Sequence, residues 1–129
     1  HCTLQRAFDL TTDPFIALED AIKCGFKRIL TSGQQASVLQ GTQLIKQLIE
    51  VAENRIDILP GAGITSENVL QLIEETGCVE VHTSAKMYQK TDPDQTFQFR
   101  EGIYDFTKLI VTDADEVNKI KVITNQFSS

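Results

Sequence analysis

Two pairs of side chains in this 129-residue chain suit acid–base chemistry or anion binding. Glu80 and His82 are two residues apart, so on a strand both point to one face, where the carboxylate can orient the imidazole and raise its pKa. Arg6 and Asp9 form the second pair, in which the guanidinium can keep the carboxylate ionised or bind an anionic ligand through two hydrogen bonds. We therefore take Glu80, His82 and Asp9 as candidate catalytic residues and Arg6 as a candidate anion-binding residue. A structural ion-pair network, or a histidine hydrogen-bonded to a neighbour, would show the same residue types, and both alternatives stay open.

Glycines and hydroxyl residues at other loop positions extend the candidate anion site. Gly61 and Gly63 let the backbone approach a ligand, and their loop leads to a helix expected to begin near Ser66, where free amide groups favour an anion. The same glycines would also serve a tight turn between a strand and a helix. Arg100 follows a long loop, from which it can return over the site as an anion clamp or remain solvated. The other candidates stand where expected strands end: Thr31, Ser32, Gly33 and Ser84.

Strands and helices are expected to alternate along the chain and to place these residues at strand ends. Apolar runs predict strands over about residues 3–8, 26–31, 55–59 and 79–82. Apolar positions three and four residues apart predict helices over about residues 14–24, 36–53 and 66–75. Residues 86–106 are polar and exceed an ordinary loop in length, which indicates a functional or mobile loop. Asp113 and Glu116 resemble a capping box for a last helix that ends near Gln126.

This alternation is typical of βαβ units, whose strands lie parallel in one sheet. In barrels built from such units, the carboxyl ends of the strands and the loops after them form the active site. A closed eight-stranded barrel takes roughly 250 residues, so this chain has the length of about half a barrel. We expect residues 1–129 to form one partial TIM-barrel domain of four βα units and a C-terminal helix, with the N-terminal half missing. Open flavodoxin-like or Rossmann sheets remain alternatives, although the G-x-G at Gly61 and Gly63 lacks the third glycine of the dinucleotide fingerprint.

The composition argues against two classes of partner. The chain has 41% hydrophobic and 23% charged residues and can bury a core, but no apolar stretch approaches the length of a membrane span. A net charge of −6, with Lys and Arg spread singly, argues against a nucleic-acid surface. The three cysteines lack a C-x-x-C spacing and indicate free thiols. We expect a cytoplasmic protein that binds neither nucleic acid nor membrane.

Four motifs in register resemble the CutC family of copper homeostasis proteins. They are R-A-F-D at 6–9, R-I-L-T-S-G at 28–33, P-G-A-G-I at 60–64 and E-V-H-T-S-A at 80–85, accompanied by Gln40-Gly41 and Phe99-Arg100. The resemblance spans almost the whole chain and implies a triosephosphate-isomerase-type barrel, of which this chain resembles the C-terminal half from about the fifth strand onward. It also implies a cytoplasmic protein that handles copper. The family's strand-end residues correspond here to Arg6, Asp9, Thr31, Ser32, Gly33, Gly61, Gly63, Glu80, His82, Ser84 and Arg100.

The resemblance implies copper as a ligand, with His82 as the tentative metal-binding residue. Copper(I) prefers sulfur ligands, and the chain supplies three scattered cysteines and one methionine, so no complete site is visible. The family usually has histidine where this chain has Gln5, and asparagine where it has Glu101. Because glutamine lacks an imidazole nitrogen, Gln5 makes metal binding on its strand less favourable.

Three functional hypotheses follow from the residues and the resemblance. The first is copper binding or trafficking in copper homeostasis. The second is a barrel enzyme that acts on a small anionic metabolite by acid–base chemistry, and the third is an inactive remnant with an incomplete site. In each case, four parallel strands alone would expose two edges and an apolar face. We therefore expect either self-association or docking onto the missing N-terminal half-barrel.

Overall fold

The computed structural model of the chain describes residues 2–90 and 108–127. Within these ranges a three-stranded parallel sheet runs in the order β1, β2, β3, and a separate antiparallel hairpin pairs β4 with β5. The strands are β1 (Thr3–Leu4), β2 (Arg28–Thr31), β3 (Asp57–Pro60), β4 (Lys86–Lys90) and β5 (Lys108–Thr112). The helices are α1 (Pro14–Lys23), α2 (Thr42–Ala52), α3 (Val69–Thr76) and α4 (Ala114–Asn125), with short 3-10 helices at Arg6–Leu10 and Val38–Gln40. The expected α/β class with a parallel sheet is confirmed.

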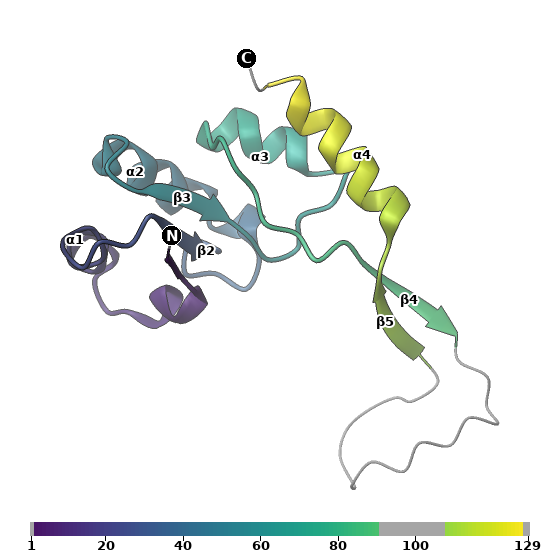
Figure 1. Ribbon diagram of the computed structural model, residues 1–129, viewed down its shortest axis with the longest axis horizontal. Helices are drawn as coiled ribbons and strands as arrows, with labels where there is room; N and C mark the ends of the chain where they lie inside the picture. The colour runs from purple at the N-terminus through teal and green to yellow at the C-terminus, as the bar shows by residue number, and fades with distance from the viewer. Residues whose placement is uncertain (1, 91–107, 128–129) are drawn as a thin grey trace, which may run out of the picture.

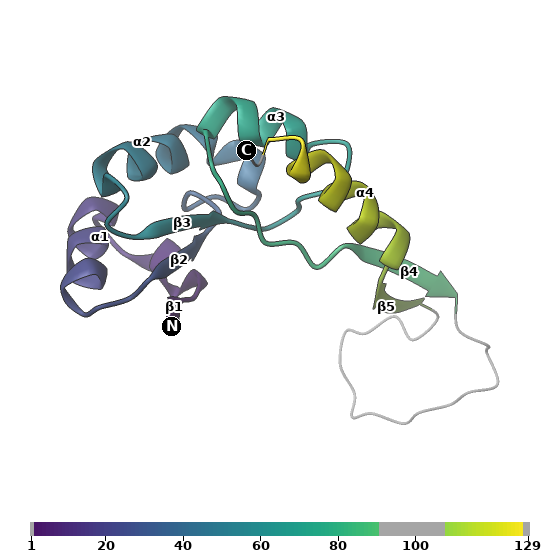
Figure 2. The same ribbon diagram turned by 45° about the horizontal axis from the view of Figure 1, so that its top comes forward.

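Helices α1, α2 and α3 lie on one side of the parallel sheet, as both ribbon views show (Figure 1, Figure 2). The core forms between the helices and the sheet, where Ile29 of β2 lies opposite Ile58 of β3. The helix residues packed in the same core include Leu18, Leu48 and Leu72. All five side chains are at most 5% exposed. Burying a Leu or Ile side chain contributes about 1.5–3 kcal/mol, so this apolar layer fixes where the carboxyl ends of the strands lie.

The start and end of α1 follow from local sequence signals. The Asp13 carboxylate accepts hydrogen bonds from the N–H groups of Phe15 (2.9 Å) and Ile16 (3.1 Å), and Pro14 presets the first turn. Just after the helix, Gly25 has a φ of +82°, which glycine adopts at little cost. The predicted helix over residues 14–24 is confirmed to within one residue. The predicted strands over 26–31 and 55–59 are also present, each starting two residues later than expected.

The first strand is shorter than the prediction over residues 3–8. The chain leaves the sheet after Leu4 and forms a 3-10 helix, in which the Phe8 N–H donates to the Gln5 carbonyl (3.1 Å). This turn buries Phe8, which is 1% exposed, and brings Asp9 to the end of β2. The burial and the hydrogen bonds of Asp9 outweigh the strand propensity of the segment.

The predicted strand over residues 79–82 was wrong. Among the described residues, this segment pairs with the sheet at one point, where Gly61 lies opposite His82 and the His82 N–H donates to the Pro60 carbonyl (2.8 Å). The next pairing in a parallel ladder would need a residue-60 N–H to donate to the Glu80 carbonyl, and proline has no N–H. The ladder therefore ends at Pro60.

The predicted helix over residues 36–53 is broken at Gly41. A Cβ atom added to Gly41 would lie 2.0 Å from the Ser32 carbonyl oxygen and 2.8 Å from the Gly33 Cα. Two backbone segments thus touch at this point, which no residue with a side chain would allow. The contact separates the 3-10 helix Val38–Gln40 from α2 and anchors the loop after β2.

The C-terminal third departs most from the sequence-based expectations. Part of the predicted loop over 86–106 is strand β4, and the hairpin extends away from the parallel sheet (Figure 1). Helix α3 begins at Val69 rather than near Ser66, because Ser66 donates its hydroxyl to Glu116 (2.9 Å) instead of capping α3. Asp113 caps α4 by accepting from the Asp115 N–H (2.9 Å), so the predicted start of the last helix is confirmed, but Glu116 does not complete a capping box.

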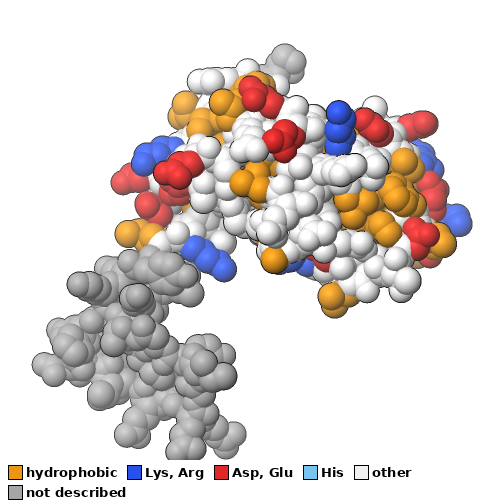
Figure 3. Space-filling model, turned by 180° about the vertical axis from the view of Figure 1, so that it is seen from behind, with side chains coloured by type: hydrophobic (Ala, Val, Ile, Leu, Met, Phe, Trp, Pro, Cys, Tyr) orange, Lys and Arg blue, Asp and Glu red, His pale blue; other side chains and the backbone are white. Residues whose placement is uncertain are grey.

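Acidic, basic and hydrophobic side chains are interspersed on the face opposite to that of Figure 1 (Figure 3). The largest exposed apolar side chains on α1 are Phe15 and Ile16, which are 37% and 62% exposed. No helix within the described residues is long and apolar enough to cross a membrane. Because the two kinds of charge are interspersed, the surface seen in Figure 3 shows no concentration of a single charge type.

Candidate functional site

A hollow of about 450 Å³ lies at the carboxyl ends of β2 and β3; we call it the strand-end hollow. Its lining residues come from the 3-10 helix Arg6–Leu10, from β2 and β4, and from three loop segments. They are Arg6, Leu30, Ala36, Ser37, Ala62, Gly63, His82, Thr83, Ser84 and Lys86. Two cationic side chains and one imidazole are among them, and no carboxylate is. The hollow therefore has the charge of a site for an anion.

Asp9 lies next to the hollow as the centre of a hydrogen-bond network. Its carboxylate accepts from the Thr31 hydroxyl, the Ser32 N–H (3.1 Å) and the Gln34 N–H (3.2 Å), and its side chain is 8% exposed. Burial acts to raise the pKa of Asp9, but the hydrogen bonds from Thr31, Ser32 and Arg6 together outweigh it, so the pKa lies below its ordinary value. Asp9 is thus held as an anion whose oxygens are occupied by protein donors.

The guanidinium of Arg6 is fixed by this network on one side. Its Nε donates to Asp9 (3.0 Å) and its Nη2 donates to the Ser32 hydroxyl (3.0 Å). The Arg6 side chain is 47% exposed, and its Nη1 makes no hydrogen bond to the residues that the structure describes. A guanidinium held in this way presents its remaining N–H groups to a ligand without having to be ordered first.

Glu80 interacts with Arg28 and not with His82. Its carboxylate accepts two hydrogen bonds from Arg28, at 2.7 Å from Nε and 3.1 Å from Nη2. Arg28 stands at the amino end of β2, opposite the end that carries the hollow, and Glu80 is not among the lining residues. The Glu80–His82 pair proposed from the sequence therefore has a strong competitor in the Arg28–Glu80 ion pair.

We predict that Glu80→Gln will change stability only slightly. Both partners are about 40% exposed, so solvent and salt screen the ion pair. The variant should lower Tm by no more than about 5 °C, and the difference should shrink in high salt. Thermal unfolding of Glu80→Gln, Arg28→Gln and the double variant at two salt concentrations measures this coupling. A large, salt-independent loss would show that the pair is a structural necessity.

His82 reaches the hollow because Gly61 lies beside it without a side chain. A Cβ on Gly61 would lie 2.7 Å from a methyl carbon of Leu30 and 3.4 Å from the Cβ of His82. The imidazole of His82 is exposed and makes no hydrogen bond to the described part of the chain. It is therefore available to a ligand, either as a hydrogen-bond donor or as a proton-transfer group.

Strained backbone also occurs around the hollow. Ala62 has a φ of +91°, and Gln34 and Ala85 have φ values of +60° and +42°, although none of them is glycine. Such conformations cost about 1–3 kcal/mol each and tend to occur at functional sites. The Ala62 carbonyl accepts a hydrogen bond from Val38 N–H (3.0 Å), which helps to hold the strained turn.

The candidates predicted from sequence fall into two groups in the structure. The hollow brings together Arg6, Gly63, His82 and Ser84, with Gly61 beneath it. The Asp9 network contains Thr31 and Ser32, and the Gly33 N–H donates to the Thr31 hydroxyl oxygen (2.9 Å). Arg100 and Glu101 lie outside the described residues. Sequence reasoning missed Lys86, which directly follows the E-V-H-T-S-A motif in the sequence.

The side chains that bind metals are scattered among the described residues. No group of three or more His, Cys, Asp or Glu side chains that could hold a metal ion occurs in residues 2–90 and 108–127. The cysteines are unpaired and separate: Cys2 and Cys24 are exposed, and Cys78 is buried. Since copper(I) prefers several sulfur ligands, His82 alone does not fit it.

We predict that the three thiols will differ sharply in reactivity. Burial raises the pKa of the Cys78 thiol, which is 7% exposed, whereas Cys2 and Cys24 are open to solvent. A disulfide reagent should modify two thiols of the native chain quickly and the third only on unfolding. Equal rates for all three thiols under native conditions would contradict the packing described for Cys78.

A parallel sheet with helices on one face and polar residues at the strand ends is an α/β arrangement consistent with the TIM-barrel type. A sequence model of the CutC family matches residues 1–87. The chain belongs to the CutC family. The solved structure of CutC from Streptococcus agalactiae resembles it with a TM-score of 0.59 and 33% identity, over 63% of this chain and 40% of that one.

Two relatives with curated names also carry the family name CutC. The copper homeostasis protein cutC homolog of Mus musculus is 39% identical over 129 residues, which cover 94% of this chain and 46% of the relative. Family protein CutC of Pasteurella multocida is 49% identical over 90 residues, which cover 70% of this chain and 37% of the relative. This chain therefore spans less than half the length of these two relatives.

Proposed function

We propose that this chain takes part in copper homeostasis and binds a small anionic ligand in the strand-end hollow. The role in copper homeostasis is supported by the names of its relatives. The ligand class is supported by one observation: Arg6, His82 and Lys86 line a single hollow that contains no carboxylate. In a chain with a net charge of −6, such a local concentration of positive groups is unlike the chain as a whole.

Direct copper binding or trafficking is the finer meaning that the relatives' names suggest. The described residues do not fit copper as a tightly held ligand, because His82 has no second metal-binding side chain beside it and the cysteines are apart. We propose that copper binding by this chain alone is weak and depends on the exposed thiols. A cytoplasmic location belongs to the same proposal, since the cytoplasm keeps thiols such as these reduced.

Acid–base catalysis on the bound anion is a second candidate function, and His82 supports it. The imidazole is exposed at the hollow, within the set of residues that would hold the ligand. Asp9 and Glu80 are less suited to proton transfer because protein donors already occupy their carboxylates. An enzyme working here would use His82 as the proton-transfer group and Arg6 as the anion ligand.

Thermal unfolding in the presence of anions tests the ligand class. Sulfate, phosphate and succinate are added at matched ionic strength, with chloride as the reference. A bound anion should raise Tm in a saturable way, since a ligand of the folded state stabilises it. Arg6→Gln should abolish the rise, whereas Arg55→Gln, which removes an arginine paired with Glu19 away from the hollow, should keep it. No saturable rise with any anion would refute the proposal.

A competition titration with copper(I) and a chelator under reducing conditions tests the metal. We expect weak binding that is lost in Cys2→Ala plus Cys24→Ala and kept in His82→Ala. Stoichiometric, tight binding that His82→Ala abolishes would instead place copper in the strand-end hollow.

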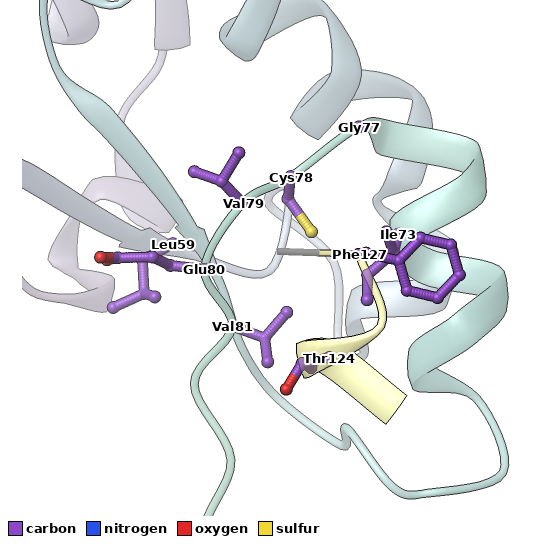
Figure 4. A pocket seen from close by; sticks show the side chains of 9 residues that line it. All are labelled: Leu59, Ile73, Gly77, Cys78, Val79, Glu80, Val81, Thr124 and Phe127. Carbon is purple, nitrogen blue, oxygen red and sulfur yellow. The ribbon is translucent and has the colours of Figure 1, made fainter. Parts of the chain in front are cut away.

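We propose that further βα units of CutC type cover the open edge of the sheet beside β3. A second hollow of about 690 Å³ lies there, between residues 77–81 and the ends of α3 and α4. Figure 4 shows the apolar side chains around it, and Val79 and Phe127 are 83% and 48% exposed. The Mus musculus relative contains more than twice the length that this chain matches, so the family supplies such units.

Sedimentation of the chain alone and of a mixture tests this partner. The added partner is the part of the Mus musculus relative that this chain does not match. We expect concentration-dependent self-association of the chain alone, because exposed apolar edges associate, and a 1:1 complex in the mixture. A chain that stays monomeric at all concentrations and does not bind the added part would contradict the proposal.

A further inference from the structure

We propose that the ligand of the strand-end hollow is a small phosphate monoester, with its phosphate at Arg6, His82 and Lys86. The proposal rests on the proposed function, since it names the class of anion for the same site. Three properties of the hollow support it: its charge, its unpaired hydrogen-bond donors and its size.

The positive charge of the hollow favours a highly charged anion. Arg6 and Lys86 each carry a full positive charge, and neither His82 nor Lys86 has an ion pair within the described residues. The carboxylate of Asp9 offsets part of the charge of Arg6 through their ion pair at 3.0 Å, so Lys86 carries the positive charge that no carboxylate of the described residues pairs with. A phosphate monoester carries close to two negative charges at neutral pH, whereas one carboxylate carries one.

The donors around the hollow suit an anion with several oxygens. Arg6 has Nη1 left over after its bonds to Asp9 and Ser32. The hydroxyls of Ser37 and Ser84, also in the lining, have no hydrogen-bond partner within the described residues. A phosphate group has three strong acceptor oxygens that point in different directions, so it can use donors from several loops together. A planar carboxylate would satisfy fewer of them.

The size of the hollow indicates an organic part beside the phosphate. Its volume of about 450 Å³ falls in the usual range for small-molecule sites and exceeds what an inorganic phosphate ion would fill. Leu30, Ala36 and Ala62 supply apolar lining next to the cationic groups. These side chains offer no hydrogen bonds, so they fit carbon atoms rather than further anionic oxygens. The expected ligand is a phosphorylated small molecule of a few carbon atoms.

Titration calorimetry on the complete 129-residue chain tests the inference with three probes: glycerol 3-phosphate, inorganic phosphate and succinate. We expect glycerol 3-phosphate to bind at least about tenfold more tightly than either of the other two, since it alone combines a tetrahedral phosphate group with an organic part. Arg6→Gln and Lys86→Gln should each weaken it by about tenfold or more. Arg6→Lys keeps the charge but loses the planar guanidinium. Its affinity for glycerol 3-phosphate should therefore lie between that of Arg6→Gln and that of the unchanged chain.

Two control variants remove the same charges elsewhere. Arg55→Gln and Lys46→Gln lie away from the hollow and should leave the affinity unchanged. Lys86 is exposed and makes no ion pair among the described residues, so Lys86→Gln should fold even if Arg6→Gln does not.

The outcomes separate this inference from the proposed function. Tighter binding of succinate would overturn the phosphate class and leave the anion site standing. Equal binding of inorganic phosphate and glycerol 3-phosphate would overturn the role given to Leu30 and Ala36. If none of the probes binds, and the thermal shifts with anions are also absent, the anion site itself is wrong.

Discussion

Replacing Gly41 with alanine is expected to destabilise the fold by about 3 kcal/mol or more, enough to unfold a marginally stable chain. The added Cβ would lie 2.0 Å from the Ser32 carbonyl oxygen and 2.8 Å from the Gly33 Cα, and these are backbone atoms that cannot rotate away. Relief requires the loop after β2 to move away from the start of α2. Because that loop carries Ser32 and Gln34, the Asp9 network should be lost with it. Chemical denaturation followed by far-ultraviolet circular dichroism measures the loss.

Gly63→Ala is the matched control for this prediction. Gly63 has a φ of +81°, and no atom lies within 4 Å of the position that a Cβ would take, so alanine there would carry only the cost of the backbone conformation. That cost is about 1 kcal/mol. If Gly41→Ala were no more damaging than Gly63→Ala, the close contact between Gly41 and Ser32 would not exist in solution.

Removing the Asp9 carboxylate is expected to lower the free energy of unfolding by about 3 kcal/mol. In Asp9→Ala the N–H groups of Ser32 and Gln34 lose an acceptor next to the buried end of β2. Arg6 also loses the partner that fixes its Nε, so its N–H groups no longer have a set direction. We therefore expect anion binding to weaken together with stability. Denaturation and calorimetry on Asp9→Ala and Asp9→Asn measure the two effects.

The contribution of Asp9 should also depend on pH. Its pKa is lower in the folded chain than in the unfolded chain, where an aspartate has a pKa of about 3.9. Between these two pKa values the unfolded state binds more protons, so stability rises with pH there. The stabilisation by Asp9 is present above about pH 4 and lost as the pH falls through the folded pKa. The difference in stability between the unchanged chain and Asp9→Asn should shrink over this acidic range, and a constant difference would contradict the lowered pKa.

Local signals predicted the parts of the fold that depend on neighbouring residues. Asp13 and Pro14 indicated the start of α1, and the apolar spacing of α2 indicated its buried face. The break at Gly41 could not be predicted in this way, because it depends on contact with Ser32, which lies nine positions earlier. The end of the sheet at Pro60 could have been foreseen, since the ladder to residue 80 needs an N–H that proline lacks.

The candidate site was predicted only where its residues are neighbours in the sequence. The Arg6–Asp9 pair is local and was expected, but its anchors Thr31 and Ser32 come from another strand end. The alternation of side chains along a strand predicted that Glu80 lies beside His82. In the structure Glu80 pairs instead with Arg28, which is 52 positions away in the chain. Lys86 joins the hollow through the path of the chain after the E-V-H-T-S-A motif, which no spacing rule describes.

Amide-correlation NMR of the chain during titration with inorganic phosphate would locate the bound anion. We expect saturable shifts at the backbone amides of Ser37, Gly63, Ser84 and Lys86 and at the Nε–H of Arg6, all of them at the strand-end hollow. The Nε–H of Arg55, which donates to the Ala52 carbonyl (3.1 Å), should not shift. If no shifts occurred at the hollow, or if they occurred around Arg55 instead, the strand-end hollow would not be the anion site.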